Sequence, residues 1–118
     1  MGRVVKEGEF QRFQRYFRQY QKVFGLTGWM VYFKHEPLDG YFADVTFSCV
    51  DMVATVRLSS ILEEKDWKQR DIRRSAKHEA LHLLLGRIEY EAKVRYTVEG
   101  TLYEAVEEVV HKLEGLIP

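Results

Sequence analysis

Aromatic residues near the N-terminus restrict the fold of this chain more than any other feature of its sequence. They recur at steps of three and four positions, with arginine and glutamine between them, at Phe10, Phe13, Phe17, Tyr20 and Phe24. This spacing is the period of an α-helix, so it predicts a helix with one aromatic face. We expect that face to belong to the core rather than to a binding surface.

Three segments with the composition of β-strands follow the helix. Gly25 and Gly28 end the helical pattern, and residues 29–38, 41–50 and 52–61 are then rich in β-branched and aromatic side chains. A proline with an Asp-Gly pair separates the first two segments, and a single aspartate separates the last two. The pattern predicts a three-stranded, mostly antiparallel sheet, with the third segment as a candidate edge.

Two more helices are predicted in the C-terminal half. The first runs from near Trp67 or Asp71 to Gly86, where the glycine is a candidate C-cap. The last begins at Thr101, and its apolar stripe consists of Leu102, Val106, Val109, Val110 and Leu113. Residues 88–100 fit an ordered loop that could contain a short strand at residues 93–98.

The last helix is expected to end at Gly115 and Pro118. Together these elements predict an α+β fold, and the length of 118 residues fits a single domain over residues 1–118.

Charge and composition argue against several classes of protein. Eighteen basic and eighteen acidic residues leave no net charge that would attract nucleic acid or an anionic membrane. The only cysteine, Cys49, has apolar neighbours and is expected to be a buried, reduced thiol. The N-terminus lacks the apolar core of a signal peptide, and no apolar stretch approaches the roughly 18 residues that span a bilayer. We therefore expect a soluble, cytoplasmic protein with no membrane partner; its oligomeric state is left open.

The segment KHEALHLLLGRI, residues 77–88, carries the strongest functional signal. On a helix, His78 and His82 lie one turn apart on the same face and form a chelate for a metal such as Zn²⁺. Glu79, one position round the helix, can take a proton from a zinc-bound water as that water attacks a carbonyl. With four His and thirteen Glu in 118 residues, random placement gives about 0.014 such HExxH motifs, so coincidence is a weak explanation.

A catalytic zinc site needs a third protein ligand. The longer HExxHxxGxxH motif of the metzincins is absent, because Leu85 and Ile88 stand where its glycine and last histidine would be. The best-placed donors are on the last helix, where Glu104, Glu108 and His111 share one face with Glu107 at its border.

The HEALH motif, followed about twenty residues later by LYEAVEEVVHKL on another helix, resembles the gluzincin arrangement of zincin metallopeptidases. The chain is most similar to small intracellular members of this group, the SprT-like and ImmA/IrrE-type proteins and their phage-encoded relatives. The similarity covers about residues 55–118, and only HExxH is specific within it. It implies a minimal zincin-like domain, Glu104 as the third ligand, and Glu108 as a partner that orients a ligating histidine.

The residues also allow other roles for these side chains. Thr101 and Glu104 have the spacing of a capping box, in which the glutamate would bond the first amide of its helix. His111 is an alternative third ligand. Tyr90, Arg95, Tyr96 and His111 could each stabilise an oxyanion, and Tyr96 is our choice among them.

The remaining features concern binding partners. The zincin resemblance implies a polypeptide substrate extended along the sheet edge, paired with ATVRLS at residues 54–59. Basic residues gather at Arg12, Arg15 and Arg18 and in residues 68–77, as a solvated face or as an interface for DNA or an acidic partner. His35 is expected at the surface.

These observations predict a zinc-dependent metallopeptidase that hydrolyses an intracellular polypeptide. His78, His82 and Glu104 would hold the metal, and Glu79 and Tyr96 would be catalytic. The alternative is a zincin-fold binding or regulatory protein, with a protein or DNA partner and no peptidase activity. The presence of Glu79 favours catalysis, because a structural zinc does not need it.

Overall fold

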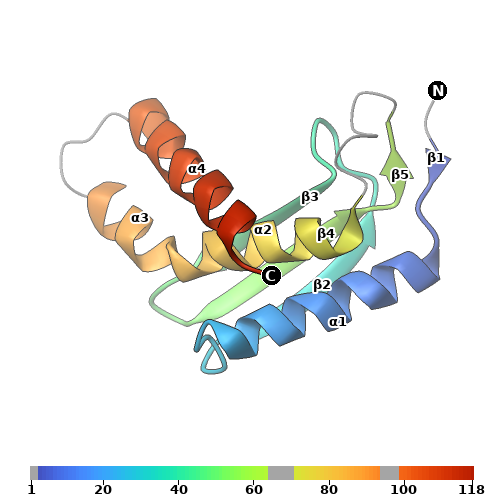
Figure 1. Ribbon diagram of the computed structural model, residues 1–118, viewed down its shortest axis with the longest axis horizontal. Helices are drawn as coiled ribbons and strands as arrows, with labels where there is room; N and C mark the ends of the chain where they lie inside the picture. The colour runs from blue at the N-terminus through green and yellow to red at the C-terminus, as the bar shows by residue number, and fades with distance from the viewer. Residues whose placement is uncertain (1–2, 64–70, 94–98) are drawn as a thin grey trace.

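The computed structural model describes residues 3–63, 71–93 and 99–118, which form an α+β fold (Figure 1). Within these ranges the chain forms four helices, a mixed three-stranded sheet and a small antiparallel pair of strands. In chain order the elements are β1 (Arg3–Val4), α1 (Glu7–Val23), β2 (Met30–Glu36), β3 (Ala43–Ser48), β4 (Val53–Ser59), β5 (Ile61–Leu62), α2 (Ile72–Leu84), α3 (Gly86–Lys93) and α4 (Glu99–Leu116).

The three long strands occupy the predicted segments, but the sheet that they form differs from the prediction. The order is β2-β4-β3, with β2 parallel and β3 antiparallel to β4. The sheet is therefore mixed rather than mostly antiparallel. The chain passes from β2 to β3 without pairing these two strands, and β4 then inserts between them as the central strand. The segment expected to offer a free edge is thus paired on both sides.

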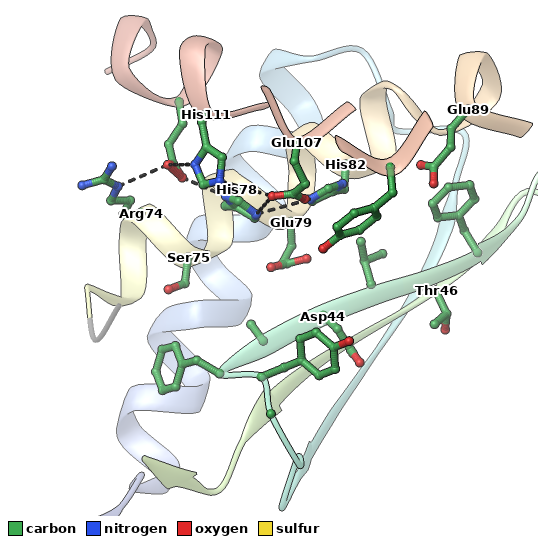
Figure 2. A pocket seen from close by; sticks show the side chains of 18 of the residues that line it. Asp44, Thr46, Arg74, Ser75, His78, Glu79, His82, Glu89, Glu107 and His111 are labelled. Carbon is green, nitrogen blue, oxygen red and sulfur yellow. Dashed lines mark hydrogen bonds and ion pairs between the residues drawn. The ribbon is translucent and has the colours of Figure 1, made fainter. Parts of the chain in front are cut away.

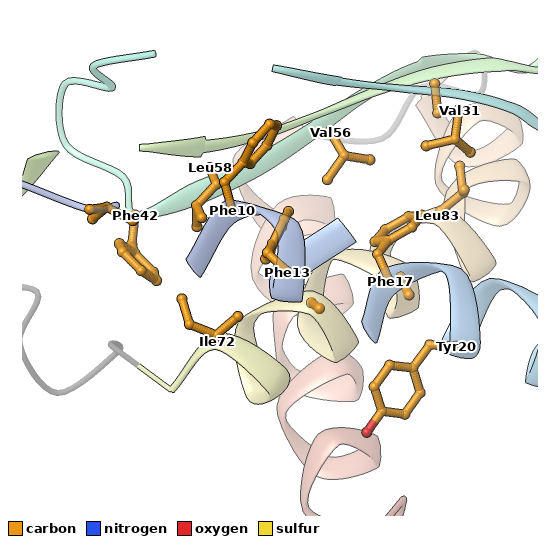
Figure 3. Close-up of a cluster of buried hydrophobic side chains, with 14 of the residues drawn as sticks. Phe10, Phe13, Phe17, Tyr20, Val31, Phe42, Val56, Leu58, Ile72 and Leu83 are labelled. Carbon is orange, nitrogen blue, oxygen red and sulfur yellow. The ribbon is translucent and has the colours of Figure 1, made fainter. Parts of the chain in front are cut away.

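The aromatic face of α1 is buried, as its spacing predicted. Phe13 and Phe17 are fully buried between α1, the sheet and α2 (Figure 3). Phe10 and Tyr20 are also buried, whereas Phe24 is partly buried. Both α1 and α2 lie against one face of the sheet (Figure 1). Helix α2 therefore packs against α1 on one side and against the sheet on another.

The helix that carries the HExxH motif begins one residue after Asp71. The Asp71 side chain accepts a hydrogen bond from the backbone N–H of Arg74, which is the interaction of an N-cap. The helix ends at Leu84, and Gly86 begins α3 instead of capping α2. A Cβ atom on Gly86 would lie only 2.6 Å from the Phe47 ring, so the glycine allows the α2–α3 junction to approach β3.

Helix α4 packs on α2 through its apolar stripe. Val106 and Val110 are buried with Leu81 of α2, while Val109, also assigned to the stripe, is exposed. The helix starts at Glu99 and continues through Gly115, so Thr101 lies inside it and is not its N-cap.

Two smaller expectations were wrong. His35 is not a surface residue: its side chain is 14% exposed, stacks on the Phe10 ring at 4.7 Å, and has a buried Nε2 without a hydrogen-bond partner among the described residues. Cys49 is a free thiol, but it is half-buried in the turn between β3 and β4. Among the described helices, none combines the length and hydrophobicity that crossing a membrane requires.

Candidate metal centre

His78 and His82 point toward the same position beside α2 (Figure 2). Their ring centroids are 4.9 Å apart, and their Nε2 atoms are separated by 3.2 Å. Two imidazole nitrogens at 2.0–2.1 Å from one tetrahedral zinc ion would be about 3.3 Å apart. The spacing of the two rings therefore fits a shared metal ion without rearrangement.

Glu107 of α4 completes a set of three possible ligands. One of its carboxylate oxygens contacts His82 Nε2 directly, and the other lies 3.8 Å from His78 Nε2. One ligand atom from each of His78, His82 and Glu107 lies within 4.8 Å of the other two. Two imidazoles and one carboxylate are a donor set found in catalytic zinc sites.

The structure does not bring Glu104 or Glu108 to the histidines. Both are exposed, and Glu108 pairs with Lys112 at 2.9 Å. Burial of Val106 and Val110 fixes how α4 is rotated, and Glu104 then lies about 60° further round the helix than Glu107. Glu107 thus takes the position at which we expected Glu104.

A second carboxylate orients His78. The Nδ1–H of His78 donates a 2.9 Å hydrogen bond to Oε2 of Glu114, a tautomer that follows because a carboxylate only accepts. This leaves the Nε2 lone pair facing the proposed metal position. Burial by itself would raise the pKa of Glu114. The hydrogen bonds and electrostatic attraction of His78 and Arg74 outweigh this effect and hold the pKa of the carboxyl below its usual value.

His111 lies beside this network without joining the first ligand set. Its Nε2 is 3.2 Å from Glu107 Oε2, and its Nδ1 is 3.6 Å from Glu114 Oε1. His78, His111 and Glu114 form a second possible ligand group. The Arg74 guanidinium, 3.3 Å from Glu114, would repel a cation there, so the first group is the better site.

Replacing Glu114 with glutamine is expected to weaken zinc binding by about 10- to 100-fold, because a charged partner of a ligating histidine is lost. Competition with a chromophoric chelator would measure the affinity. Glu108→Gln, on the exposed side of α4, is the matched control and should leave the affinity unchanged. Equal zinc affinities for Glu114→Gln and the unmodified protein would contradict the orienting role.

Glu79 is almost fully buried and points from α2 toward β3, below the two histidines (Figure 2). In the metal-free protein, burial together with the negative charges of Asp44, Glu107 and Glu114 raises the pKa of Glu79 to about 8. His82 has a lowered pKa because burial outweighs the attraction of Glu107, which favours the neutral imidazole that a metal requires.

This burial predicts a pH-dependent difference in the stability of the metal-free protein. Below pH 4.5 the carboxyl of Glu79 is protonated in both folded and unfolded chains. Between 4.5 and about 8 the unfolded chain ionises first, so the folded state loses relative stability as the pH rises. Glu79→Gln should therefore match the unmodified protein at pH 4 and exceed it by on the order of a few kcal/mol at pH 8.5. Urea unfolding in chelator would show this, and a constant difference across the pH range would contradict it.

The candidate metal centre forms one wall of a cleft of about 930 Å³. β3 lies opposite, and residues of α3 and α4 complete the lining. The backbone N–H of Ser59 in β4 donates to the carbonyl oxygen of Phe42, just before β3. Every second residue of an antiparallel strand hydrogen-bonds the same neighbour, so residues 44, 46 and 48 of β3 also direct their N–H and C=O groups toward β4. The N–H and C=O groups of Ala43, Val45 and Phe47 therefore face away from β4, along the edge of the sheet that borders the cleft.

The catalytic tyrosine predicted from sequence, Tyr96, and the neighbouring Arg95 lie outside the described residues. Tyr90 and Tyr103 line the cleft. Partial desolvation, followed by the charge of Glu107, raises the pKa of Tyr103 above its usual value. Its hydroxyl is therefore protonated at neutral pH, as in an ordinary tyrosine, and can donate a hydrogen bond. Sequence reasoning overlooked Tyr103, although it is one turn before Glu107 on the same face of α4.

Comparison with known proteins gave no relative: no family model, no curated protein and no solved structure matches this chain. Interpretation of the site therefore depends on its own residues.

Proposed function

We propose that this protein is a zinc-dependent metallopeptidase that hydrolyses peptide bonds of a polypeptide. The observation that carries the proposal is the convergence of His78, His82 and Glu107 beside a buried glutamate, Glu79, in the wall of a cleft. A structural zinc site is normally closed by four protein ligands, whereas three ligands in an open cleft leave a position for chemistry.

The residues around this centre have distinct tasks in peptide hydrolysis. When bound, zinc would supply Lewis-acid polarisation and make water easier to deprotonate. Glu79 would accept the proton of the attacking water and pass it to the leaving amine. Glu114 would hold His78 in its ligating tautomer. The protonated hydroxyl of Tyr103 would donate a hydrogen bond to the oxyanion, the role assigned from sequence to Tyr96.

An extended substrate would lie along β3. The outward N–H and C=O groups of Ala43, Val45 and Phe47 could pair with its backbone as an added strand. This replaces the expectation that residues 54–59 would bind the substrate, because β4 has no free edge.

The likeness to gluzincins supports the same proposal. Its two elements, an HExxH helix and a glutamate on a later helix, both border the cleft, with Glu107 in the position of the third ligand. The HEALH motif at residues 78–82 is also similar to those of SprT-like and ImmA/IrrE-type proteins. Zinc remains the proposed metal because both imidazoles and a carboxylate suit it.

Metal removal tests the proposal directly. Purified protein is expected to contain about one zinc per chain by elemental analysis and to cleave an unfolded polypeptide such as casein. A chelator should abolish cleavage, and stoichiometric zinc should restore it. Stoichiometric zinc with no cleavage of any unfolded polypeptide would favour the alternative, a binding or regulatory protein with a protein or DNA partner.

A further inference from the structure

One part of the cleft, named here the α3 subsite, lies beside α3. It is lined by Phe47 of β3, by Glu89, Tyr90 and Lys93 of α3, and by Tyr103 of α4. The Glu89 side chain is only 14% exposed, and it points from α3 toward the part of β3 that carries Thr46 (Figure 2). Its charge acts on both His82 and Tyr103, so the subsite adjoins the metal centre.

The lining of this subsite combines aromatic rings with one carboxylate. Phe47, Tyr90 and Tyr103 offer surfaces against which a long aliphatic chain can pack, and ring faces attract cations. The largely buried carboxylate of Glu89 beside them can form a charge-assisted hydrogen bond. Lysine and arginine side chains have the matching structure, an apolar stem and a cationic end.

Lys93 shows that Glu89 can accept an ammonium group at this position. The Nζ atom of Lys93 is 3.4 Å from Glu89 and 3.8 Å from Glu99, and its side chain is 44% exposed. Because the Lys93 end of this ion pair is exposed to solvent, the pair is weak, and a substrate cation could replace Lys93. Lys93 would then keep its second partner, Glu99.

We propose that this subsite binds a lysine or arginine side chain of the polypeptide, with Glu89 as the residue that determines the specificity. The inference rests on the proposed function for the path of the substrate along β3. An extended chain on that edge directs every second side chain to the face of the sheet that carries the helices. The subsite lies on that face, because Phe47 packs there against the core.

Peptide binding to zinc-loaded Glu79→Gln protein tests the specificity without consuming the peptide. The probes are fluorescent ten-residue peptides of Ala, Ser and Thr with one central Lys, Arg, Gln, Met or Glu. The Lys and Arg peptides should bind at least about tenfold more tightly than the Gln and Met peptides, with the Glu peptide weakest. Equal affinities, or no measurable binding of the Lys peptide, would overturn the proposal.

Added substitutions identify the residue responsible. Glu89→Gln should abolish the preference for Lys and Arg, whereas Glu91→Gln, exposed on the same helix, should keep it. Lys93→Gln should strengthen binding of the Lys peptide by about threefold, because the internal competitor is removed. A preference that survives Glu89→Gln would exclude Glu89 as its source.

Turnover of the same peptides by the unmodified protein separates this inference from the proposed function. Selective binding that depends on Glu89, without cleavage, would support the subsite and contradict the peptidase. Cleavage that is indifferent to the central residue would support the peptidase and contradict the subsite.

Discussion

Replacing Glu79 with glutamine is expected to reduce peptide hydrolysis by about 10²- to 10⁴-fold while zinc remains bound. The amide keeps the size of the side chain but cannot accept the proton of the attacking water. It also suits the buried position, because it adds no charge to a site surrounded by Asp44, Glu107 and Glu114. The fold should therefore persist, and the loss should appear in kcat rather than in metal content.

The measurement is the rate of cleavage by zinc-loaded protein, together with the zinc content of the same sample. Glu91→Gln on the exposed side of α3 is the control, since it makes the same chemical change away from the cleft. Unchanged cleavage by Glu79→Gln would remove the general base from the mechanism and would favour the binding-protein alternative.

Glu107→Ala should lower zinc affinity by at least about 100-fold. Loss of a residue that only orients a ligand typically reduces affinity by about 10- to 100-fold, and loss of a ligand should have at least that effect. Glu104→Ala provides a matched control, because both glutamates are on α4 and are separated by less than one turn. It should leave the affinity unchanged, since Glu104 is exposed and outside the ligand group.

Titration with zinc against a competing chelator would give both affinities. The reverse outcome, with Glu104→Ala weakened and Glu107→Ala unaffected, would restore the ligand assignment that the gluzincin resemblance implied. If neither substitution lowered the zinc affinity, both glutamates would be excluded as ligands. His111, which belongs to the second possible ligand group, would then be the candidate third ligand.

Local sequence patterns predicted most of the helices and strands correctly. The aromatic spacing in α1 and the three β-rich segments were readable because each pattern depends on neighbours within a few residues. Residues 88–100 gave no such pattern, and the expected loop was wrong where the structure describes it. Residues 88–93 form most of α3 and residues 99–100 begin α4, while residues 94–98 lie outside the described residues. The mostly antiparallel sheet with the third segment at its edge was a wrong prediction. Hydrophobic alternation marks which face of a strand is buried but not which strand lies beside it.

The residues of the candidate site also differ in how far they could be predicted from local sequence. His78, Glu79 and His82 come from one helical turn, so their spacing alone places them together. Glu107 and Glu114 belong to another helix, and their approach depends on how α4 is rotated against α2. Their seven-residue spacing, beside the buried Val106 and Val110, was the signal that could have identified them.

The sequence by itself therefore determined the helix that presents two imidazoles and a glutamate, and the aromatic face that anchors the core. Only the tertiary structure decided that Glu107 rather than Glu104 meets the histidines, that β3 rather than β4 borders the cleft, and that Glu79 is buried among other carboxylates. The physical reason is range: helical period acts between residues three or four apart, whereas helix rotation and strand order follow from packing between segments distant in the chain.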